Sequence, residues 1–465
     1  MKFTERFEYM FRAILPSPFS IAVILSLITL VCGLAIKPSS DSWSEYSMHL
    51  LSSWETELWN KGLLAFAVQM MLMLVLGHVL ALSPVIAKLL NKLTKLCSSN
   101  TKAIFYCTLF TILVSLFNWG LGLIFGAIFA RKIGEYASEN NIKINYPLIA
   151  AAGYVGLMVW HGGISGSAPI KVAEDGHLLN MAEGVLNSNE LSSIPNNLGF
   201  TETIFSSMNI FAMICLIVIV PLSLSLISKY FPSSIPNLDI IKNDNSEQGS
   251  AILPAEKLDQ SKIFSITIGI LIVLYSSIKV SNLPGNSISS LSFINPNYIN
   301  LNLLGLCLIF HASVKNFLGG LESAISGVSG ILIQFPLYFG IMGLMKASGL
   351  IEYISTAMIN ISSETTFPIF TFISSGIVNI FVPSGGGQWM VQGPIIIKAA
   401  NSLDVPLSKA IMALSYGDQI TNMLQPFWAL PLLGITKLKA GQILPYTLIL
   451  FLIGSVIFVG TLIIF

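Results

Sequence analysis

Hydrophobic residues fill most of the chain in runs of about 20 residues that are separated by polar segments. A helix needs about 20 apolar residues to cross the hydrocarbon core of a bilayer, so each such run predicts one membrane-spanning helix. Nine of the runs are uninterrupted, at residues 14–36, 62–87, 146–169, 203–228, 263–280, 299–314, 320–345, 407–435 and 442–464. The pattern predicts an all-α integral membrane protein.

Two further apolar runs, 103–130 and 366–397, are interrupted near their middle. The first contains Asn118–Gly120 (NWG), and the second contains Val382–Gly387 (VPSGGG). Glycine and proline weaken a helix, so each run is a kinked crossing, a double crossing or a re-entrant hairpin. Basic residues collect in cytoplasmic loops, and two hairpins with a cytoplasmic N-terminus place 17 of the 24 Lys and Arg on that side. We therefore expect nine crossings, two re-entrant hairpins and an external C-terminus.

Short sequence similarities recur in the same order about 260 residues apart, which indicates an internal repeat. Examples are Phe66–Met70 with Ile331–Phe335, Ser98–Thr101 with Ser362–Thr365, and Ala150–Tyr154 with Met412–Gly417. Five crossings separate equivalent points, so the two repeats are expected to be inverted, as in many secondary transporters. The expected organisation is an N-terminal repeat at 1–228, a cytoplasmic linker at 229–262, a linking helix at 263–280 and a C-terminal repeat at 299–465.

Four segments inside apolar runs have sequences that interrupt helices, at residues 118–122, 160–169, 382–389 and 416–426. Backbone groups that are freed there cannot face lipid, so they line protein or a watery cavity. Free N–H groups at a helix start attract anions, whereas carbonyl, hydroxyl and amide oxygens suit a small cation. The alternative is that the glycines serve only close helix packing. Four such segments in matching places favour a binding site with broken helices.

Ionisable residues are scarce within the apolar runs. Arginine occurs only at Arg6, Arg12 and Arg131, outside the runs or at an edge. An anion must therefore be held by amides, hydroxyls or a co-bound cation, which favours a singly charged carboxylate. Asp418 is the one carboxylate well inside a run, and intramembrane carboxylates are usually functional. We predict that Asp418 couples transport to a proton or a sodium ion, with a hydrogen-bonded structural role as the alternative. His161, beside the first broken helix, could also titrate.

Composition narrows the class further. The chain is 54% hydrophobic and 10% charged, whereas soluble domains carry about 25% charged residues. The net charge of +1 argues against a nucleic-acid partner. The five cysteines lack metal-ligand spacing, so we expect no metal site and no cofactor. No phosphate-binding GxxxxGK[ST] motif is present in the sequence. The first run lacks a small-residue cleavage site, and we interpret it as a permanent anchor.

An enzyme is the competing class. Gly163–Gly166 reads GISG, the nucleophile pattern of intramembrane serine proteases, and His311 on a later run could serve as a base. Four-residue motifs are common, however, and His311 lies at the edge of its predicted span. The second repeat has no equivalent Ser–His pair, so the sequence predicts a protein that is not an enzyme.

Longer motifs resemble those of a known family. They are Asn118–Arg131, Gly162–Pro169, Ile331–Ile341, Val382–Pro394 and Tyr416–Pro431. On these segments the chain closely resembles the bacterial short-chain fatty acid transporters, the acetoacetate/butyrate permeases of the ion transporter superfamily. The similarity extends nearly from end to end and is weakest in 37–60, 170–200 and 230–260. It implies a secondary carrier that moves short monocarboxylates such as acetoacetate or butyrate across the bacterial inner membrane.

The resemblance also implies where the site lies, because these folds hold substrate and ion between two hairpin tips and two broken helices. The tips correspond to Asn118–Gly120 and Pro383–Gly387, and the breaks to Gly162–Ser167 and Asp418–Asn422. Our hypothesis for substrate binding comprises Ser165, Gly166, Ser167, Ser384, Gly385, Gly386, Gly387 and Trp389. For the coupling ion it comprises Asp418, Asn118, Asn379, Thr421 and Asn422. Apolar walls for the acyl chain would be Trp160, Trp389 and Trp428, unless these tryptophans only pack or lie at the interface.

The sequence departs from the family pattern at two positions. Asp418 stands where the family often has glutamate, and Gln388 stands where it can have histidine. The ion that drives symport is therefore open between proton and sodium. A dicarboxylate carrier or cation/proton antiporter of the same superfamily, and a passive channel, remain alternatives. The expected partners are a short monocarboxylate, the coupling ion and the lipid bilayer, with homo-oligomerisation left open.

Overall fold

The computed structural model describes residues 18–38, 42–183, 186, 188–238, 254–282, 296–325, 328–383 and 385–465. All the regular secondary structure in these ranges is helical. The β-type pairing is limited to two isolated bridges, Ile144–Ser234 and Glu183–Leu186. The prediction of an all-α protein is therefore confirmed. A bilayer favours this class because a helix satisfies its backbone hydrogen bonds internally.

The helices of the first half begin with α2 and end with α14. They are α2 (Pro18–Ala35), α3 (Trp43–Leu58), α4 (Lys61–Leu82), α5 (Pro84–Thr94), α6 (Asn100–Phe117), α7 (Trp119–Glu139), α8 (Tyr146–Tyr154), α9 (Ser167–Val172), α10 (His177–Ala182), α11 (Ser188–Leu191), α12 (Ser207–Ile227), α13 (Pro254–Gln260) and α14 (Lys262–Ser281). Two short 3-10 turns, at Val155–Met158 and Trp160–Gly162, lie between α8 and α9, and a third follows α12 at Ser228–Tyr230.

The described part of the second half is also helical. Its helices are α16 (Pro296–His311), α17 (Val314–Ile325), α18 (Ser329–Ala347), α19 (Leu350–Asn360), α20 (Phe367–Phe381), α21 (Gly385–Ser402), α22 (Leu407–Thr421), α23 (Pro426–Thr436) and α24 (Ala440–Ile464). A 3-10 turn at Asn422–Leu424 joins α22 to α23.

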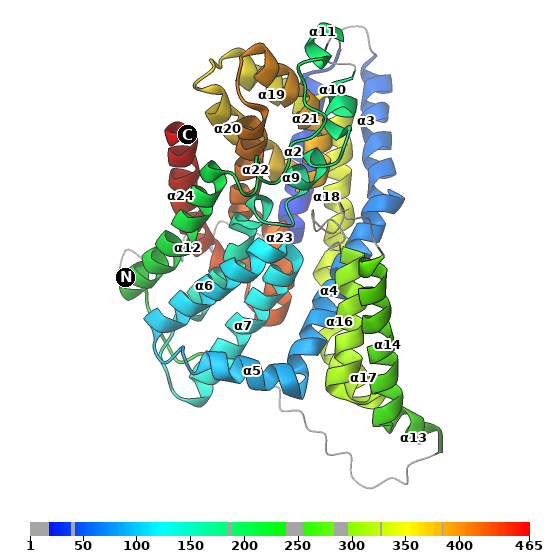
Figure 1. Cartoon of the computed structure of the whole chain (residues 1–465), viewed down its shortest axis with the longest axis vertical. Coiled ribbons are helices and arrows are strands. Elements are labelled where there is room, and N and C mark those ends of the chain that lie inside the picture. The colour runs from blue at the N-terminus through cyan, green and yellow to red at the C-terminus, as the bar shows by residue number, and fades with distance from the viewer. Residues whose placement is uncertain are drawn as a thin grey trace.

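The helices pack in two groups (Figure 1). One group contains α2, α3, α4, α14, α16, α17 and α18, and the other contains α6 to α9, α12 and α20 to α24. Contacts of α4 with α7 and of α18 with α23 join the groups. The two interrupted runs form the pairs α6–α7 and α20–α21. Both pairs and both broken helices belong to the second group, so this group carries the candidate site.

The same order of elements occurs twice. A long helix, a shorter helix, a helix pair and a broken helix run from α4 to α9 and again from α18 to α23. The equivalent elements begin about 260 residues apart, for example α6 at Asn100 and α20 at Phe367. This order is the one that an internal repeat requires. The inverted orientation of the repeats and the re-entrance of each pair stay predictions.

Two expectations for the spans differ from the structure. The run 320–345 is not one helix, because its first residues belong to α17 and α18 begins at Ser329. The mean hydropathy of the run does not separate the amphipathic helix α17, which packs on α4, from the more apolar α18, so the two were predicted as one span. The other difference is α3, which forms in a region expected to be loop. Its sequence mixes polar and apolar residues, and it packs along α18.

Five of the described helical segments are long and apolar enough to cross a membrane. They are Asn100–Phe117, Tyr146–Val172, Ser207–Tyr230, Lys262–Ser281 and Ala440–Ile464, and a bent pair within 43–80 would make a sixth. The predicted total of nine crossings stays a prediction. Residues 1–17 and 239–253, which include the start of the first run and part of the linker, lie outside the described residues.

Candidate substrate and ion site

Asn118 forms the tip between α6 and α7. Its backbone is extended, with φ −151° and ψ 125°, and its Oδ1 accepts a hydrogen bond from Leu121 N at 2.9 Å. Asn118 is thus the N-cap of α7, a role that asparagine fills well. The first broken helix lies against this tip, because Ser165 Oγ accepts from Trp119 N at 2.9 Å and Ile164 N donates to Leu116 O at 2.9 Å.

The first broken helix unwinds earlier than predicted, starting with the 3-10 turn at Val155 rather than at Gly162. Glycines are required where the backbone turns back toward α6. A Cβ on Gly163 would lie 2.5 Å from Leu116 O, and one on Gly166 would lie 2.1 Å from His161 O. Neither contact is sterically allowed, so this break depends on glycine at both positions.

The second broken helix is interrupted four residues later than predicted. Asp418 lies in the last turn of α22, and the helical path is lost at Asn422 to Gln425. Gln425 has φ −93° and ψ 121°, the extended conformation that the following Pro426 favours. The interruption therefore follows the proline and not the carboxylate, and the expected break at Asp418–Asn422 is wrong at its start.

Four of the five predicted ion residues meet in one hydrogen-bonded network, Asp418 through its backbone oxygen. Asn379 Nδ2 lies 2.7 Å from Asp418 O, 3.0 Å from Thr421 Oγ1 and 2.9 Å from Asn422 Oδ1. Gln425 Nε2 also donates to Asn379 O. The network ties α20 to the break after α22. Asn118 does not take part in any of these contacts, because its amide oxygen caps α7.

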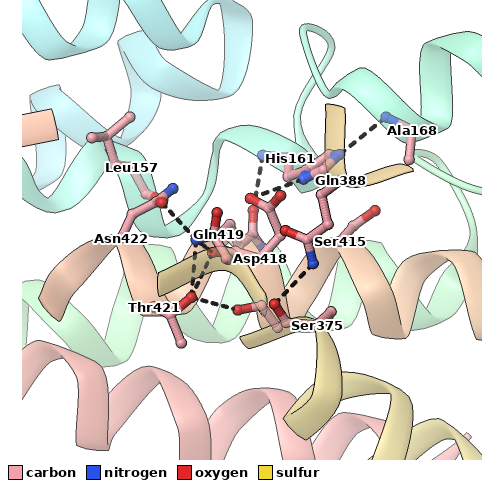
Figure 2. Close-up of polar contacts among 12 residues, drawn as sticks. Leu157, His161, Ala168, Ser375, Gln388, Ser415, Asp418, Gln419, Thr421 and Asn422 are labelled. Atoms are coloured by element: carbon pink, nitrogen blue, oxygen red, sulfur yellow. Dashed lines mark hydrogen bonds and ion pairs between the residues drawn. The ribbon is translucent and has the colours of Figure 1, made fainter. Parts of the chain in front are cut away.

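Asp418 faces His161 across the two halves of the chain (Figure 2). Oδ1 of Asp418 lies 3.4 Å from Nδ1 of His161, and the two side chains are 1% and 0% exposed. The other ring nitrogen, Nε2, lies 3.0 Å from Ala168 N and accepts from that amide. Gln419 Oε1 accepts from His161 N at 2.9 Å and from Gly162 N at 3.0 Å, which holds the backbone of this turn against α22. The sequence indicated each residue separately but not their pairing.

A cavity of about 70 Å³ lies next to this pair. Its lining residues are Trp119, Leu157, Trp160, Ser167, Gly385, Gly386 and Trp428. The indole of Trp119 is 5.9 Å from that of Trp160 and 5.3 Å from that of Trp428, measured between ring centroids. The cavity thus has three aromatic walls and a polar edge at Ser167 and the two glycines.

Some of the predicted substrate residues lie elsewhere. Trp389 is fully buried in a separate apolar cluster with Ala168 and Val172, and its Nε1 donates to His177 Nε2 at 2.9 Å. It is therefore not a wall of the cavity. Ser165 and Gly166 support the lining from behind, Gly387 lies in the first turn of α21, and Ser384 lies outside the described residues. Burial lowers the pKa of His177, which favours the neutral ring that accepts this bond.

Trp119 and Leu157 line the cavity but were not among the predicted site residues. Trp119 directly follows the tip residue Asn118, and that position was the available signal. Leu157 lies in the 3-10 turn before the break, whose apolar sequence looks like ordinary helix. Only the unwinding of this turn exposes it to the cavity.

Oxygen ligands for a cation are present near Asp418. Both carboxylate oxygens of Asp418, Asn379 Oδ1 and Gln388 Oε1 are buried and have no hydrogen-bond partner in the described part of the chain. Such oxygens suit a hard cation such as sodium. Across the described ranges, no three His, Cys, Asp or Glu side chains gather to hold a metal ion. Ser165 and His311 are not paired as a protease would need, since His311 Nε2 lies 2.8 Å from Val79 O.

Comparison with known proteins now identifies the family. The model of the family named "Short chain fatty acid transporter" matches residues 1–465. The chain belongs to the short-chain fatty acid transporter family. Two curated relatives are both named "Putative short-chain fatty acid transporter". The one from Escherichia coli K12 is 34% identical over 450 residues, and the one from Haemophilus influenzae Rd is 32% identical over 453 residues. Each alignment covers 96% of this chain and 95% of the relative.

The family is one of transporters and not of enzymes, and its members, including this chain, are multi-pass membrane proteins. Two solved structures are also similar to it. They are the YdaH transporter of Alcanivorax borkumensis, with a TM-score of 0.43, and MtrF of Neisseria gonorrhoeae, with a TM-score of 0.40. Each is 13% identical, each alignment covers 97% of this chain, and the shares of the two neighbours are 97% and 95%.

Proposed function

We propose that this short-chain fatty acid transporter is a secondary active carrier for short monocarboxylates such as acetoacetate or butyrate. In this proposal it lies in the bacterial inner membrane and is driven by a proton or sodium gradient. The observation that carries the proposal is the cavity beside His161, where the starts of three helices meet three indole rings.

The polar edge of the cavity suits one carboxylate. Helix α7 begins at Trp119, α21 at Gly385 and α23 at Pro426, and residues in the first turn of each of these helices line the cavity. A helix start carries about half a positive charge, and glycine lets a ligand approach the backbone closely. None of the lining residues is charged. Partial charges of this kind can match one negative charge, whereas a dicarboxylate would leave a second one without a counter-charge.

The aromatic edge suits a short acyl chain. The indoles of Trp119, Trp160 and Trp428, together with Leu157, offer apolar surface on several sides. A cavity of about 70 Å³ is small, so it favours a short acyl chain over a long one. Burial of each additional methylene contributes about 0.8 kcal/mol until the cavity is full.

Asp418 is the proposed coupling residue. It is buried, its oxygens lack hydrogen-bond partners in the described ranges, and it lies behind the cavity on α22. A buried carboxylate has a strong tendency to take up a proton or a cation, which gives a gradient a point of action. We further propose that the repeats at 1–228 and 299–465 are inverted, with a cytoplasmic N-terminus and an external C-terminus, so that alternating access can occur around the cavity.

Transport into proteoliposomes tests the function. Labelled acetoacetate or butyrate would be offered under an imposed proton gradient and, separately, a sodium gradient, with protein-free liposomes to subtract passive entry. The wild-type protein should accumulate the acid above equilibrium under one of the gradients. Asp418→Asn should lower that accumulation by at least about tenfold. The matched control is Asp404→Asn, an exposed acid with φ 55° on the loop before α22, because asparagine tolerates this backbone.

The outcomes separate the alternatives. Entry that only equilibrates would indicate a passive channel. Uptake of a diacid in preference to either monoacid would indicate a dicarboxylate carrier. The absence of uptake of either monocarboxylate under both gradients would overturn the proposed substrate class.

A further inference from the structure

The hydrogen bonds of His161 define its protonation state. Nε2 accepts from the backbone amide of Ala168, and an amide nitrogen can only donate. Nε2 therefore carries no proton, and the proton of the neutral ring is on Nδ1, which faces Asp418. The nitrogen that carries the proton in the neutral ring thus lies 3.4 Å from a buried carboxylate oxygen.

The ring lies between Asp418 and the cavity wall. Trp160, a wall residue, stacks on His161 with ring centroids 4.4 Å apart. A Cβ built on Gly385, another wall residue, would lie 3.0 Å from His161 Cε1. Ala168, whose backbone amide donates to Nε2, directly follows the wall residue Ser167. The imidazole is therefore one layer behind the lining, and Asp418, which is not a lining residue, is behind the imidazole.

Other charged side chains on the elements around the turn are remote or paired. The turn at Trp160–Gly162 packs against α6, α9, α22 and the uncharged turn at Val155–Met158, and Gly385 of α21 lies against His161. Lys398, the charged residue of α21, is exposed and lies 13 residues after Gly385. Lys171 of α9 is exposed and lies 2.8 Å from Glu174, and Lys102 near the start of α6 is also exposed. Lys409 lies nine residues before Asp418 on α22, which is about 14 Å along a helix. Asp418 is thus the charged group that faces the ring within the described ranges.

From this geometry we infer that His161 and Asp418 together form the proton carrier, with His161 Nε2 as the atom that accepts the proton, directly behind the wall against which the substrate carboxylate lies. This inference rests on the proposed monocarboxylate transport. A proton added to the lone pair of Nε2 breaks the hydrogen bond from Ala168, because both nitrogens are then donors. Nδ1 still lies 3.4 Å from Asp418 Oδ1, and the positively charged ring lies directly behind the wall residues Trp160 and Gly385.

The charges favour this order of events. Without substrate, the site holds one negative charge, on Asp418. A monocarboxylate would add a second buried negative charge, which is costly unless a positive charge enters with it. One proton on His161 restores the original charge of the site. The carrier should therefore move one proton with each monocarboxylate, without net charge transfer, and proton and substrate should each strengthen the binding of the other.

Proton uptake on substrate binding tests this inference directly. Acetoacetate would be added to the purified wild-type protein in weakly buffered detergent solution that contains a pH indicator. We expect about one proton to be taken up per bound substrate, and substrate affinity to rise about tenfold per unit as the pH falls from 8 to 6. In proteoliposomes, uptake should not respond to an imposed membrane potential.

The decisive variant is His161→Gln. Its amide can accept from Ala168 and donate to Asp418, but it cannot be protonated, so proton uptake and the pH dependence of affinity should both be lost. His311→Gln is the matched control, because His311 is also buried and bonded to a backbone carbonyl but lies on α16, outside the site. It should retain the wild-type stoichiometry.

The results that would overturn the inference are distinct from failure of the proposed function. Retention of one proton per substrate in His161→Gln, or wild-type transport that is driven by sodium and not by protons, would overturn the inference while monocarboxylate transport stands. If His161→Gln does not fold, the wild-type stoichiometry and voltage response still decide. Absence of all monocarboxylate binding and transport by the wild type would overturn both proposals.

Discussion

The two broken helices are held together by different kinds of contact. The first, from Val155 to Gly166, packs bare glycine backbone against the tip of the α6–α7 pair and against its own preceding turn. The second, from Asn422 to Gln425, is held by side-chain amides, above all by Asn379 on α20. The comparison indicates that the first break has no room for added atoms, whereas the second depends on side-chain hydrogen bonds.

The largest effect is expected from adding one methyl group to the first break. In Gly166→Ala the new Cβ would lie 2.1 Å from His161 O and 2.9 Å from His161 C. The backbone that positions His161 must shift, at a cost of about 1–3 kcal/mol or more. Acetoacetate uptake should fall by more than about tenfold, and the melting temperature in detergent should decrease.

The control for this variant is Gly319→Ala on α17, where an added Cβ meets no atom within 4 Å. Alanine in a helix should leave stability unchanged or slightly raise it. Wild-type uptake and stability in Gly166→Ala would contradict the close packing of the first break.

An intermediate effect is expected from truncation in the second break. Asn379→Ala removes the amide that contacts Asp418 O, Thr421 Oγ1 and Asn422 Oδ1. Leaving buried acceptors without donors costs about 1–3 kcal/mol, so the melting temperature and the apparent substrate affinity should both decrease. Thermal unfolding in detergent and uptake kinetics would measure the two effects.

Thr371→Val serves as the comparison for Asn379→Ala. Thr371 is buried on the same helix, but its Oγ1 has no hydrogen-bond partner in the described part of the chain. Its replacement by an isosteric apolar residue should be nearly neutral. Equal losses in the two variants would indicate that the amide network does not hold the second break.

The smallest effect is expected from the hydrogen bond between Trp389 and His177. His177 Nε2 accepts from Trp389 Nε1, and burial lowers the pKa of His177, so the folded protein favours the neutral ring. This contribution is fully present above the unfolded pKa of about 6.5 and is lost as the pH falls through the lower folded pKa. The wild type should lose about 1 °C of melting temperature by pH 5.5 through this group.

His177→Gln retains an acceptor that does not titrate in this range. The pH dependence of its melting temperature should therefore be smaller than that of the wild type, while acetoacetate uptake stays unchanged. A steeper dependence in the variant would contradict this role for His177.

Much of the fold could be predicted from local sequence. The apolar runs determined the membrane class, since no soluble fold can bury so many apolar side chains. Glycine, proline and asparagine determined that the helices break near Asn118, Gly163 and Gln425, because these residues act on the backbone next to them. The same patterns misplaced the exact ends, and they hid α3, whose helix depends on packing along α18.

The candidate site was determined only in part by the sequence. The apolar surroundings of Asp418 in the chain indicated its role without any contact information. The pairing of His161 with Asp418, the wall formed by Trp119 and the exclusion of Trp389 from the cavity were decided by the tertiary structure. These relations join residues from opposite halves of the chain or depend on which way a side chain packs. Local propensity does not specify either, because only the packed arrangement of helices sets the distances between them.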